Sequence, residues 1–172
     1  MAEPTAPQLV FLHGLESGPH GGKFQALQQL DPGVIAPDFE GVYDLTARMA
    51  IAERELASYD RLVLVGSSFG GLLAALYADR YPERVAACVL CAPALMDDRW
   101  PAVAAIAHVP AFTVLLHARQ DDIVDIAWSR SFAARHGLRL VEVDDGHRLS
   151  DSRPLLVQLA AEALAAARGG AS

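Results

Sequence analysis

Positive charge is scarce in this sequence, and long apolar runs are missing. The 172 residues include 14 lysines and arginines against 21 aspartates and glutamates, which gives a formal net charge of -7 at pH 7. Nucleic acids and anionic membranes require positive surfaces, and no lysine- or arginine-rich run supplies one locally. No apolar run approaches the roughly 20 residues of a membrane-spanning helix. We therefore expect neither a nucleic-acid partner nor a membrane partner.

Cysteine is nearly absent, with only Cys88 and Cys91 in the chain. Their spacing would suit a metal or redox pair, but both lie in the apolar run over residues 85–91, which is typical of a strand. Residues three apart on a strand face opposite sides, so we expect two buried thiols that do not meet. The lack of a disulfide framework, and of a secretory signal at the N-terminus, predicts a cytoplasmic protein.

Short apolar runs alternate with amphipathic helical patterns along the chain. The runs typical of strands are residues 9–12, 34–36, 62–65, 85–91, 112–116 and 138–143. Helical patterns cover residues 23–30, 45–58, 69–81 and 127–136, and a last one starts at Pro154. Most strand runs are continuously apolar, as in parallel sheets buried on both faces. The sequence predicts an α/β fold, a doubly wound, mostly parallel six-stranded sheet with helices on both faces. Without repeats or long linkers, we expect residues 1–172 to form a single domain.

The segment Gly66-Ser67-Ser68-Phe69-Gly70 joins the apolar run 62–65 to a helical pattern. G-x-S-x-G between a strand and a helix is typical of a nucleophile elbow, a sharp turn that exposes the serine hydroxyl. The crowded turn favours glycine two positions before and two positions after the serine. The pattern therefore indicates Ser68 as a nucleophile, the alternative being an ordinary serine at a helix start.

Three complementary side chains follow three of the predicted strands: Ser68, Asp121 and His147. The carboxyl ends of parallel strands meet at one edge of the sheet, so we expect these groups to lie together. A serine nucleophile needs a base within hydrogen-bond reach, and that base needs a third group to orient it. We assign Ser68 as nucleophile, His147 as base and Asp121 as the orienting acid.

Such chemistry also needs two N–H donors for the negatively charged oxygen of the tetrahedral intermediate. The backbone N–H of Phe69, directly after the nucleophile, is one candidate. The segment His13-Gly14-Leu15 follows the first predicted strand and offers the N–H of Leu15 as the second. We interpret His13 and His117 as loop-organising histidines.

Four segments together resemble the α/β-hydrolase superfamily. They are His13-Gly14-Leu15, Gly66-Ser67-Ser68-Phe69-Gly70-Gly71, His117-Ala118-Arg119-Gln120-Asp121 and Gly146-His147. Within the superfamily the chain is similar to small, lidless bacterial esterases of the YqiA-like kind, through His13, Gly14, Ser17 and Lys23 at one end and Asp121 and Asp125 in the acid loop. The resemblance implies hydrolysis of esters or thioesters through an acyl-enzyme, with no cofactor and no metal ion.

The acid has competitors. Some superfamily members carry it after the strand that corresponds to residues 85–91, and Asp97 and Asp98 follow that run here. Asp144 and Asp145 stand on the same loop as His147, and we interpret them as a solvated turn.

Only residues 92–111 are available for a lid, enough for one short helix. We therefore expect a shallow open cleft that suits short acyl groups. Its expected lining is Leu15, Phe69, Leu95, Met96, Trp100 and Ile123. The sequence favours a serine hydrolase that cleaves small-molecule carboxylic esters or thioesters. The alternatives are a non-catalytic binding protein of the same fold and an acyltransferase, and the sequence defines no oligomeric state.

Overall fold

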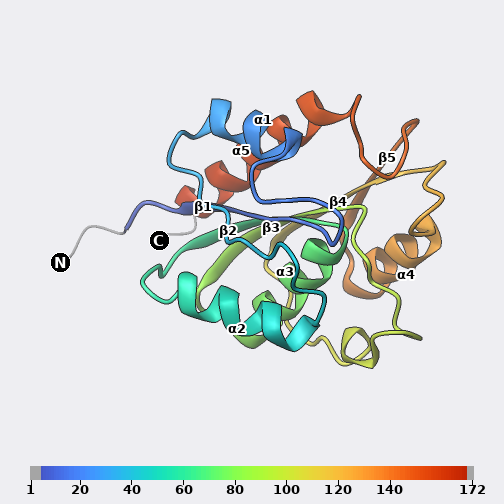
Figure 1. Ribbon diagram of the computed structural model, residues 1–172, viewed down its shortest axis with the longest axis horizontal. Helices are drawn as coiled ribbons and strands as arrows, with labels where there is room; N and C mark the ends of the chain where they lie inside the picture. Colours follow the sequence, from blue (N-terminus) through green and yellow to red (C-terminus); the bar gives the residue numbers. More distant parts are fainter. Residues whose placement is uncertain (1–4, 170–172) are drawn as a thin grey trace.

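A parallel sheet of five strands forms the centre of the fold (Figure 1). The computed structural model describes residues 5–169. The strands are β1 (Gln8–Leu12), β2 (Leu62–Ser67), β3 (Val85–Cys91), β4 (Phe112–Ala118) and β5 (Arg139–Val143). They lie in the order β1-β2-β3-β4-β5, and every neighbouring pair is parallel. All five carboxyl ends therefore open onto the same edge of the sheet.

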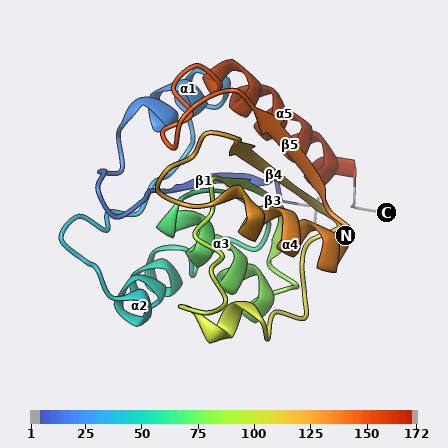
Figure 2. The ribbon, with the colours of Figure 1, turned by 90° about the vertical axis from the view of Figure 1, so that its right-hand side faces the viewer.

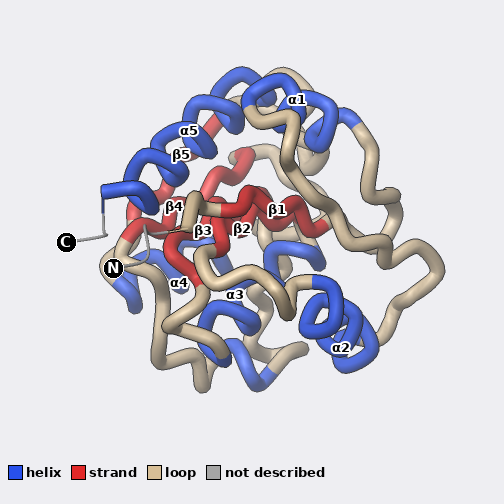
Figure 3. The backbone as a smooth tube through the Cα atoms, turned by 90° about the vertical axis from the view of Figure 1, so that its left-hand side faces the viewer, coloured by secondary structure: helices blue, strands red, loops and turns tan. Residues whose placement is uncertain are grey.

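Helices cover both faces of this sheet. Figures 2 and 3 show α1 (Gly22–Leu30) and α5 (Arg153–Gly169) on one face, and α2 (Leu45–Glu55), α3 (Phe69–Arg80) and α4 (Ile126–His136) on the other. Two apolar clusters fill the two interfaces, one between the sheet and α1 and α5, the other between the sheet and α2, α3 and α4. The predicted doubly wound α/β architecture is confirmed.

The predicted strand over residues 34–36 is reduced to one bridge. Ile35 pairs in parallel with Val10 on β1, accepting a hydrogen bond from Phe11 N–H (2.9 Å) and donating one to Leu9 O (3.1 Å). Pro37 has no N–H with which to extend this pairing. The sheet therefore has five strands, whereas the sequence predicted six, and Ile35 lies alongside β1.

The two cysteines lie on opposite faces of β3, as predicted. Cys88 belongs to the cluster under α2, α3 and α4, and Cys91 to the cluster under α1 and α5. Both thiols are free and buried. Desolvation raises the pKa of Cys88 to about 12 and that of Cys91 to about 11, so both are neutral apolar core groups at neutral pH.

The segment expected to be too short for a lid contains a single helical turn, η1 (Pro101–Val103), which packs against the core through Val103. No inserted cap covers the carboxyl edge of the sheet in the part of the chain that the structure describes. Among the helices of residues 5–169, none combines the length and the apolar character needed to cross a membrane.

Candidate active site

Ser68 stands on a strained turn between β2 and α3, with φ 55° and ψ -115°. A Cβ atom on Gly66 would lie 2.4 Å from the carbonyl oxygen of Gly70, and one on Gly70 would lie 2.0 Å from the carbonyl oxygen of Leu12. Real atoms do not approach so closely, so both positions require glycine for steric reasons. The turn is therefore the nucleophile-elbow geometry that G-x-S-x-G predicts.

The backbone of Ser68 is held from several sides, which keeps the strained conformation in place. Its N–H donates to Cys91 O (2.9 Å) at the end of β3. Its carbonyl oxygen accepts from Gly71 N–H (2.9 Å) in α3 and from Ala94 N–H (3.0 Å) in the loop after β3. The sheet, the helix and the neighbouring loop thus fix where the hydroxyl stands.

A chain of hydrogen bonds links Ser68, His147 and Asp121. His147 Nε2 lies 3.0 Å from Ser68 Oγ, and His147 Nδ1 lies 2.8 Å from Asp121 Oδ2. The Asp121 carboxylate has no exposed surface, whereas the His147 side chain is 19% exposed. Because the carboxylate accepts the proton of Nδ1, the lone pair of Nε2 faces the serine hydroxyl. The imidazole is thereby oriented to accept the proton of Ser68.

All four acceptor directions of the Asp121 carboxylate are used. Oδ1 accepts from the N–H groups of Ile123 and Val124, both at 2.9 Å, and Oδ2 lies 3.1 Å from His117 Nε2 as well as next to His147. Burial alone would raise the pKa of Asp121, but the hydrogen bonds from Val124, His147 and Ile123 outweigh it and hold the pKa below its usual value. Asp121 is therefore ionised at neutral pH.

His117 organises the loop that carries Asp121. Its Nε2–H also approaches Val124 O (2.9 Å), and its Nδ1 accepts from the hydroxyl of Ser129 (2.7 Å) in α4. Desolvation lowers the pKa of this fully buried imidazole, although Val124 and Asp121 oppose the shift. A neutral His117 therefore ties β4, the acid loop and α4 together, in the loop-organising role that the sequence suggested.

Asp145 fixes the loop that carries His147, a role beyond the solvated turn that the sequence suggested; it lies in a bend and is half-buried. Asp145 Oδ2 accepts from Ser152 N–H (3.0 Å) and Ser152 Oγ (2.8 Å), and Oδ1 accepts from Gly146 N–H (2.7 Å). From α1, Lys23 Nζ donates to Arg148 O (2.7 Å), one residue beyond His147. These bonds hold the chain on both sides of His147.

The competing acids lie elsewhere. Asp97 faces Arg135 at 4.0 Å on the surface, and Asp98 is exposed. Asp144 is exposed and pairs with Arg119 (2.9 Å). Among the described residues, the carboxylate within hydrogen-bond distance of His147 is that of Asp121.

The loop after β1 passes directly against Ser68. A Cβ atom on Gly14 would lie 3.5 Å from Ser68 Cβ and 3.4 Å from Ser67 O. Phe69 is the first residue of α3, so its N–H has no partner within the helix. Over residues 5–169, neither the N–H of Phe69 nor that of Leu15 donates to a protein acceptor. Both remain available to an oxygen beside Ser68.

The expected lining residues differ in exposure. Leu95 is only 1% exposed and packs in the core, whereas Ile123 is 68% exposed on the acid loop. The rings of Phe69 and Trp100 lie 5.5 Å apart, and Met96 and Trp100 are half-buried against the same core. A cleft made by these residues stays a prediction.

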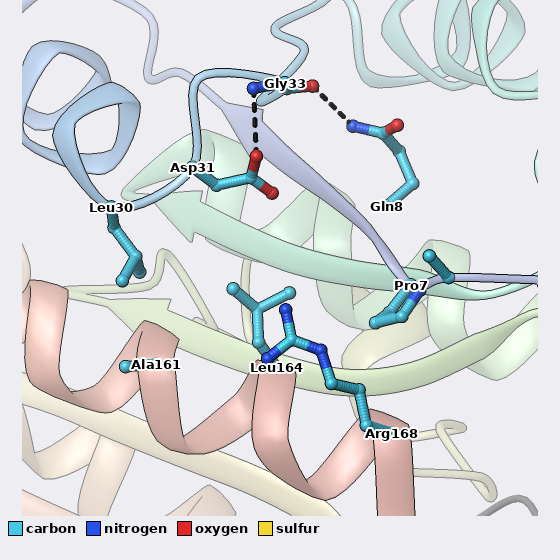
Figure 4. Close-up of a pocket in the computed structure, with 9 residues that line it drawn as sticks. Pro7, Gln8, Leu30, Asp31, Gly33, Ala161, Leu164 and Arg168 are labelled. Atoms are coloured by element: carbon cyan, nitrogen blue, oxygen red, sulfur yellow. Dashed lines mark hydrogen bonds between the residues drawn. The ribbon is translucent and has the colours of Figure 1, made fainter.

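A surface hollow of about 470 Å³ lies at the other edge of the sheet (Figure 4). It is lined by residues around the start of β1 and the ends of α1 and α5: Ala6, Pro7, Gln8, Leu30, Asp31, Gly33, Ala161, Leu164 and Arg168. Gln8 and Asp31 are engaged with the backbone of Gly33 at 2.8 and 2.9 Å. Because it contains no group of the Ser68 site, we assign this hollow no role in the chemistry.

Sequence reasoning missed Arg48, whose fully buried guanidinium contacts the loop after β1. A signal was available, because position 48 falls on the same helical face as Leu45, Met49 and Ala52, and a charged residue on an apolar face is unusual.

Comparisons with known proteins agree with this geometry. A family model of the alpha/beta hydrolase fold matches residues 38–112. A structure of a candidate alpha/beta-superfamily hydrolase from Xanthomonas campestris pv. campestris is 26% identical, with a TM-score of 0.78 over 92% of this chain and 96% of that chain. The chain therefore has the fold of the α/β hydrolases, and it is similar to them in the sequence of residues 38–112.

More distant structures share the fold alone. Est1E from Butyrivibrio proteoclasticus is 16% identical, with a TM-score of 0.76 over 95% of this chain and 89% of that chain. A monoacylglycerol lipase from Paleococcus ferrophilus is 15% identical, with a TM-score of 0.75 over 92% and 94%. A search of the curated proteins found no sequence match. These two structures therefore support the fold and leave the activity and the substrate open.

Proposed function

We propose that this protein is a serine hydrolase that cleaves carboxylic esters, with thioesters as a second substrate class. The observation that carries the proposal is the hydrogen-bonded chain from Ser68 Oγ through His147 to the buried carboxylate of Asp121, built on a nucleophile elbow. The same three groups in this order along the chain perform acyl transfer on this fold.

In the proposed reaction, Ser68 Oγ attacks the carbonyl carbon while His147 Nε2 takes the hydroxyl proton. The N–H groups of Leu15 and Phe69 stabilise the oxyanion of the tetrahedral intermediate. The intermediate collapses, and the leaving alcohol or thiol receives the proton from His147. Water then attacks the acyl-enzyme, His147 accepts a proton from it, and collapse releases the acid and returns that proton to Ser68.

Substrates with short acyl groups fit the absence of a large cap over residues 92–111. An open edge bordered by Met96, Trp100 and the exposed Ile123 offers limited apolar contact to a long chain. A structure of Est1E contains ferulic acid, so a small aromatic acyl group is a useful second probe. We propose a small-molecule ester as the substrate, processed by a single domain.

We also propose a cytoplasmic location. The buried free thiols of Cys88 and Cys91 support it, because unpaired cysteines suit a reducing compartment.

The test compares hydrolysis of p-nitrophenyl acetate, butyrate and octanoate, and of methyl ferulate, by the wild type and by Ser68→Ala. The proposal predicts activity that is greatest on the short esters and lost in the variant. Ser67→Ala is the matched control, because it removes the neighbouring hydroxyl and should retain activity. Equal inertness of wild type and Ser68→Ala would refute the proposed function and favour a binding role. With added alcohols, an ester as the main product would indicate an acyltransferase instead.

A further inference from the structure

Arg48 is a fully buried arginine on the apolar side of α2. Within residues 5–169 it forms no ion pair with a carboxylate, and its hydrogen bonds go to backbone carbonyls. Desolvation lowers the pKa of its guanidinium to about 10, so the group stays charged at neutral pH. A buried cation without a counter-ion costs stability, which suggests that it is retained for a reason other than packing.

The guanidinium joins two loops at the carboxyl edge of the sheet. In the loop after β1, its terminal nitrogens donate to His13 O (2.8 Å) and Gly14 O (3.2 Å). In the segment before α2, Nε donates to Val42 O (2.7 Å), and a longer contact of 3.4 Å reaches Phe39 O. Only a planar group with several donors can hold so many carbonyls at once.

The bond to Gly14 fixes the direction of the Leu15 N–H. In a trans peptide the C=O and the following N–H point in opposite directions, and the described residues contain no cis peptide. Because Gly14 O faces Arg48, the N–H of Leu15 faces away from Arg48. Gly14 itself lies against Ser68, so the orientation of this peptide decides whether the donor reaches the substrate oxygen.

His13 forms a second hydrogen bond to the carbonyl of the Gly14–Leu15 peptide. Its Nδ1 lies 2.8 Å from Gly14 O, and its Nε2 accepts from Phe39 N–H at 2.8 Å. Burial lowers the pKa of His13, although the bond to Gly14 opposes the shift, and the bond from Phe39 requires a lone pair on Nε2. A neutral His13 is therefore a donor at Nδ1. Two donors on Gly14 O polarise the peptide and make its N–H a better donor.

The charge also lies beside the ring of Phe69, the residue whose backbone N–H is the proposed second oxyanion donor. The Arg48 guanidinium carbon is 5.1 Å from the centre of the Phe69 ring and 5.0 Å from that of Phe39. With no carboxylate paired to it, the positive charge is available to a negative charge that develops beside Ser68.

We propose that Arg48 is a positioning residue of the oxyanion site, which directs the Leu15 N–H at the substrate oxygen and stabilises the developing negative charge. The inference rests on the proposed hydrolase function. Loss of Arg48 should lower kcat by about 10- to 100-fold, somewhat less than the loss of a whole oxyanion donor. KM should change little, because the ground-state ester carries no full charge on that oxygen.

The experiment uses Arg48→Gln, which removes the charge, and Arg48→Lys, which keeps the charge but loses the planar set of donors. Arg84→Gln is the matched control: Arg84 donates to Tyr59 O (2.8 Å) and lies over the Tyr81 ring, but it precedes β3 at the opposite edge of the sheet. For each variant, kcat and KM for p-nitrophenyl acetate are measured on protein whose folded fraction is determined by circular dichroism. The inhibition constant of a trifluoromethyl ketone, whose adduct with serine places an oxyanion in the site, is measured alongside.

The inference predicts that the inhibition constant rises in parallel with the fall in kcat, that Arg48→Lys is intermediate, and that Arg84→Gln keeps wild-type kcat per folded molecule. A folded Arg48→Lys or Arg48→Gln with wild-type kcat and inhibitor affinity would overturn it while leaving the hydrolase function intact. Losses explained entirely by the folded fraction would also overturn it, because Arg48 would then be structural only. A wild type that is inert towards esters and the ketone would instead overturn the proposed function and this inference together.

Discussion

Replacing Asp121 by asparagine should invert the hydrogen bonding of His147. The carboxylate accepts from two backbone N–H groups, those of Ile123 and Val124, through Oδ1, and from His147 and His117 through Oδ2. An amide has only one acceptor oxygen. If that oxygen faces the backbone, as the two N–H groups favour, the amide NH2 faces His147 Nδ1.

Two donors cannot face each other, so the imidazole must change tautomer. Nδ1 then accepts from the amide, and Nε2 carries the proton and points it at Ser68 Oγ. The base is lost although the side chains hardly move. For the corresponding change in a serine protease the loss in kcat is about 10⁴-fold, which corresponds to about 5 kcal/mol of transition-state stabilisation.

The assay is steady-state hydrolysis of p-nitrophenyl acetate by Asp121→Asn, with Asp122→Asn as the control. Asp122 is the exposed neighbour on the same loop, so the control makes the same chemical change without touching His147. The expected result is a fall in kcat of about 10⁴-fold for Asp121→Asn and less than about threefold for Asp122→Asn. A folded Asp121→Asn within tenfold of the wild type would refute the role assigned to this carboxylate.

Three further predictions concern stability. Ser68→Gly should raise the free energy of unfolding by about 1 kcal/mol in urea denaturation while abolishing activity, because glycine tolerates φ 55°; an unchanged or lower stability would contradict stored strain at the elbow. Gly70→Ala should lower it by about 3 kcal/mol or more, since the new Cβ would meet Leu12 O at 2.0 Å, whereas Gly146→Ala, with nothing within 4 Å, should stay within about 0.5 kcal/mol. Asp121 has a lower pKa in the folded state than in the unfolded state, so its ionised form stabilises the fold. This stabilisation is fully present above the unfolded-state pKa of about 4 and is lost as the pH falls through the folded-state pKa. The melting temperatures of the wild type and Asp121→Asn should therefore approach each other as the pH is lowered. A difference in melting temperature that grows at low pH would contradict this pH dependence.

Local patterns in the sequence predicted most of the sheet and the placement of the Ser68 site. Continuous apolar runs identified β1, β2, β3 and β4, because strands buried on both faces are mostly apolar. The run that identified β5 also contains Arg139 and Glu142, and this strand is only half-buried. The elbow was predictable because its two glycines follow from contacts within the turn and with β1. The shared edge of Ser68, Asp121 and His147 follows from parallel topology alone.

What the sequence did not predict depends on tertiary contacts. Whether residues 34–36 form a strand depends on how many N–H groups can pair with β1, and Pro37 leaves only Ile35. Leu95 was expected at the cleft but is 1% exposed, because it packs in the core between the sheet and α2, α3 and α4. Arg48 stands out in the sequence as a charged residue on the apolar face of a helix. Its acceptors, however, are carbonyls of two loops whose conformations no local pattern defines.

The most direct test of the central claim is to trap the serine covalently. The wild type, Ser67→Ala and Ser68→Ala are treated with a fluorophosphonate, and the intact mass and the labelled peptide are read by mass spectrometry. The account predicts one adduct per molecule, located at Ser68, in the wild type and in Ser67→Ala, and none in Ser68→Ala. No adduct on folded wild type, or an adduct that persists in Ser68→Ala, would contradict the assignment of Ser68 as an activated nucleophile.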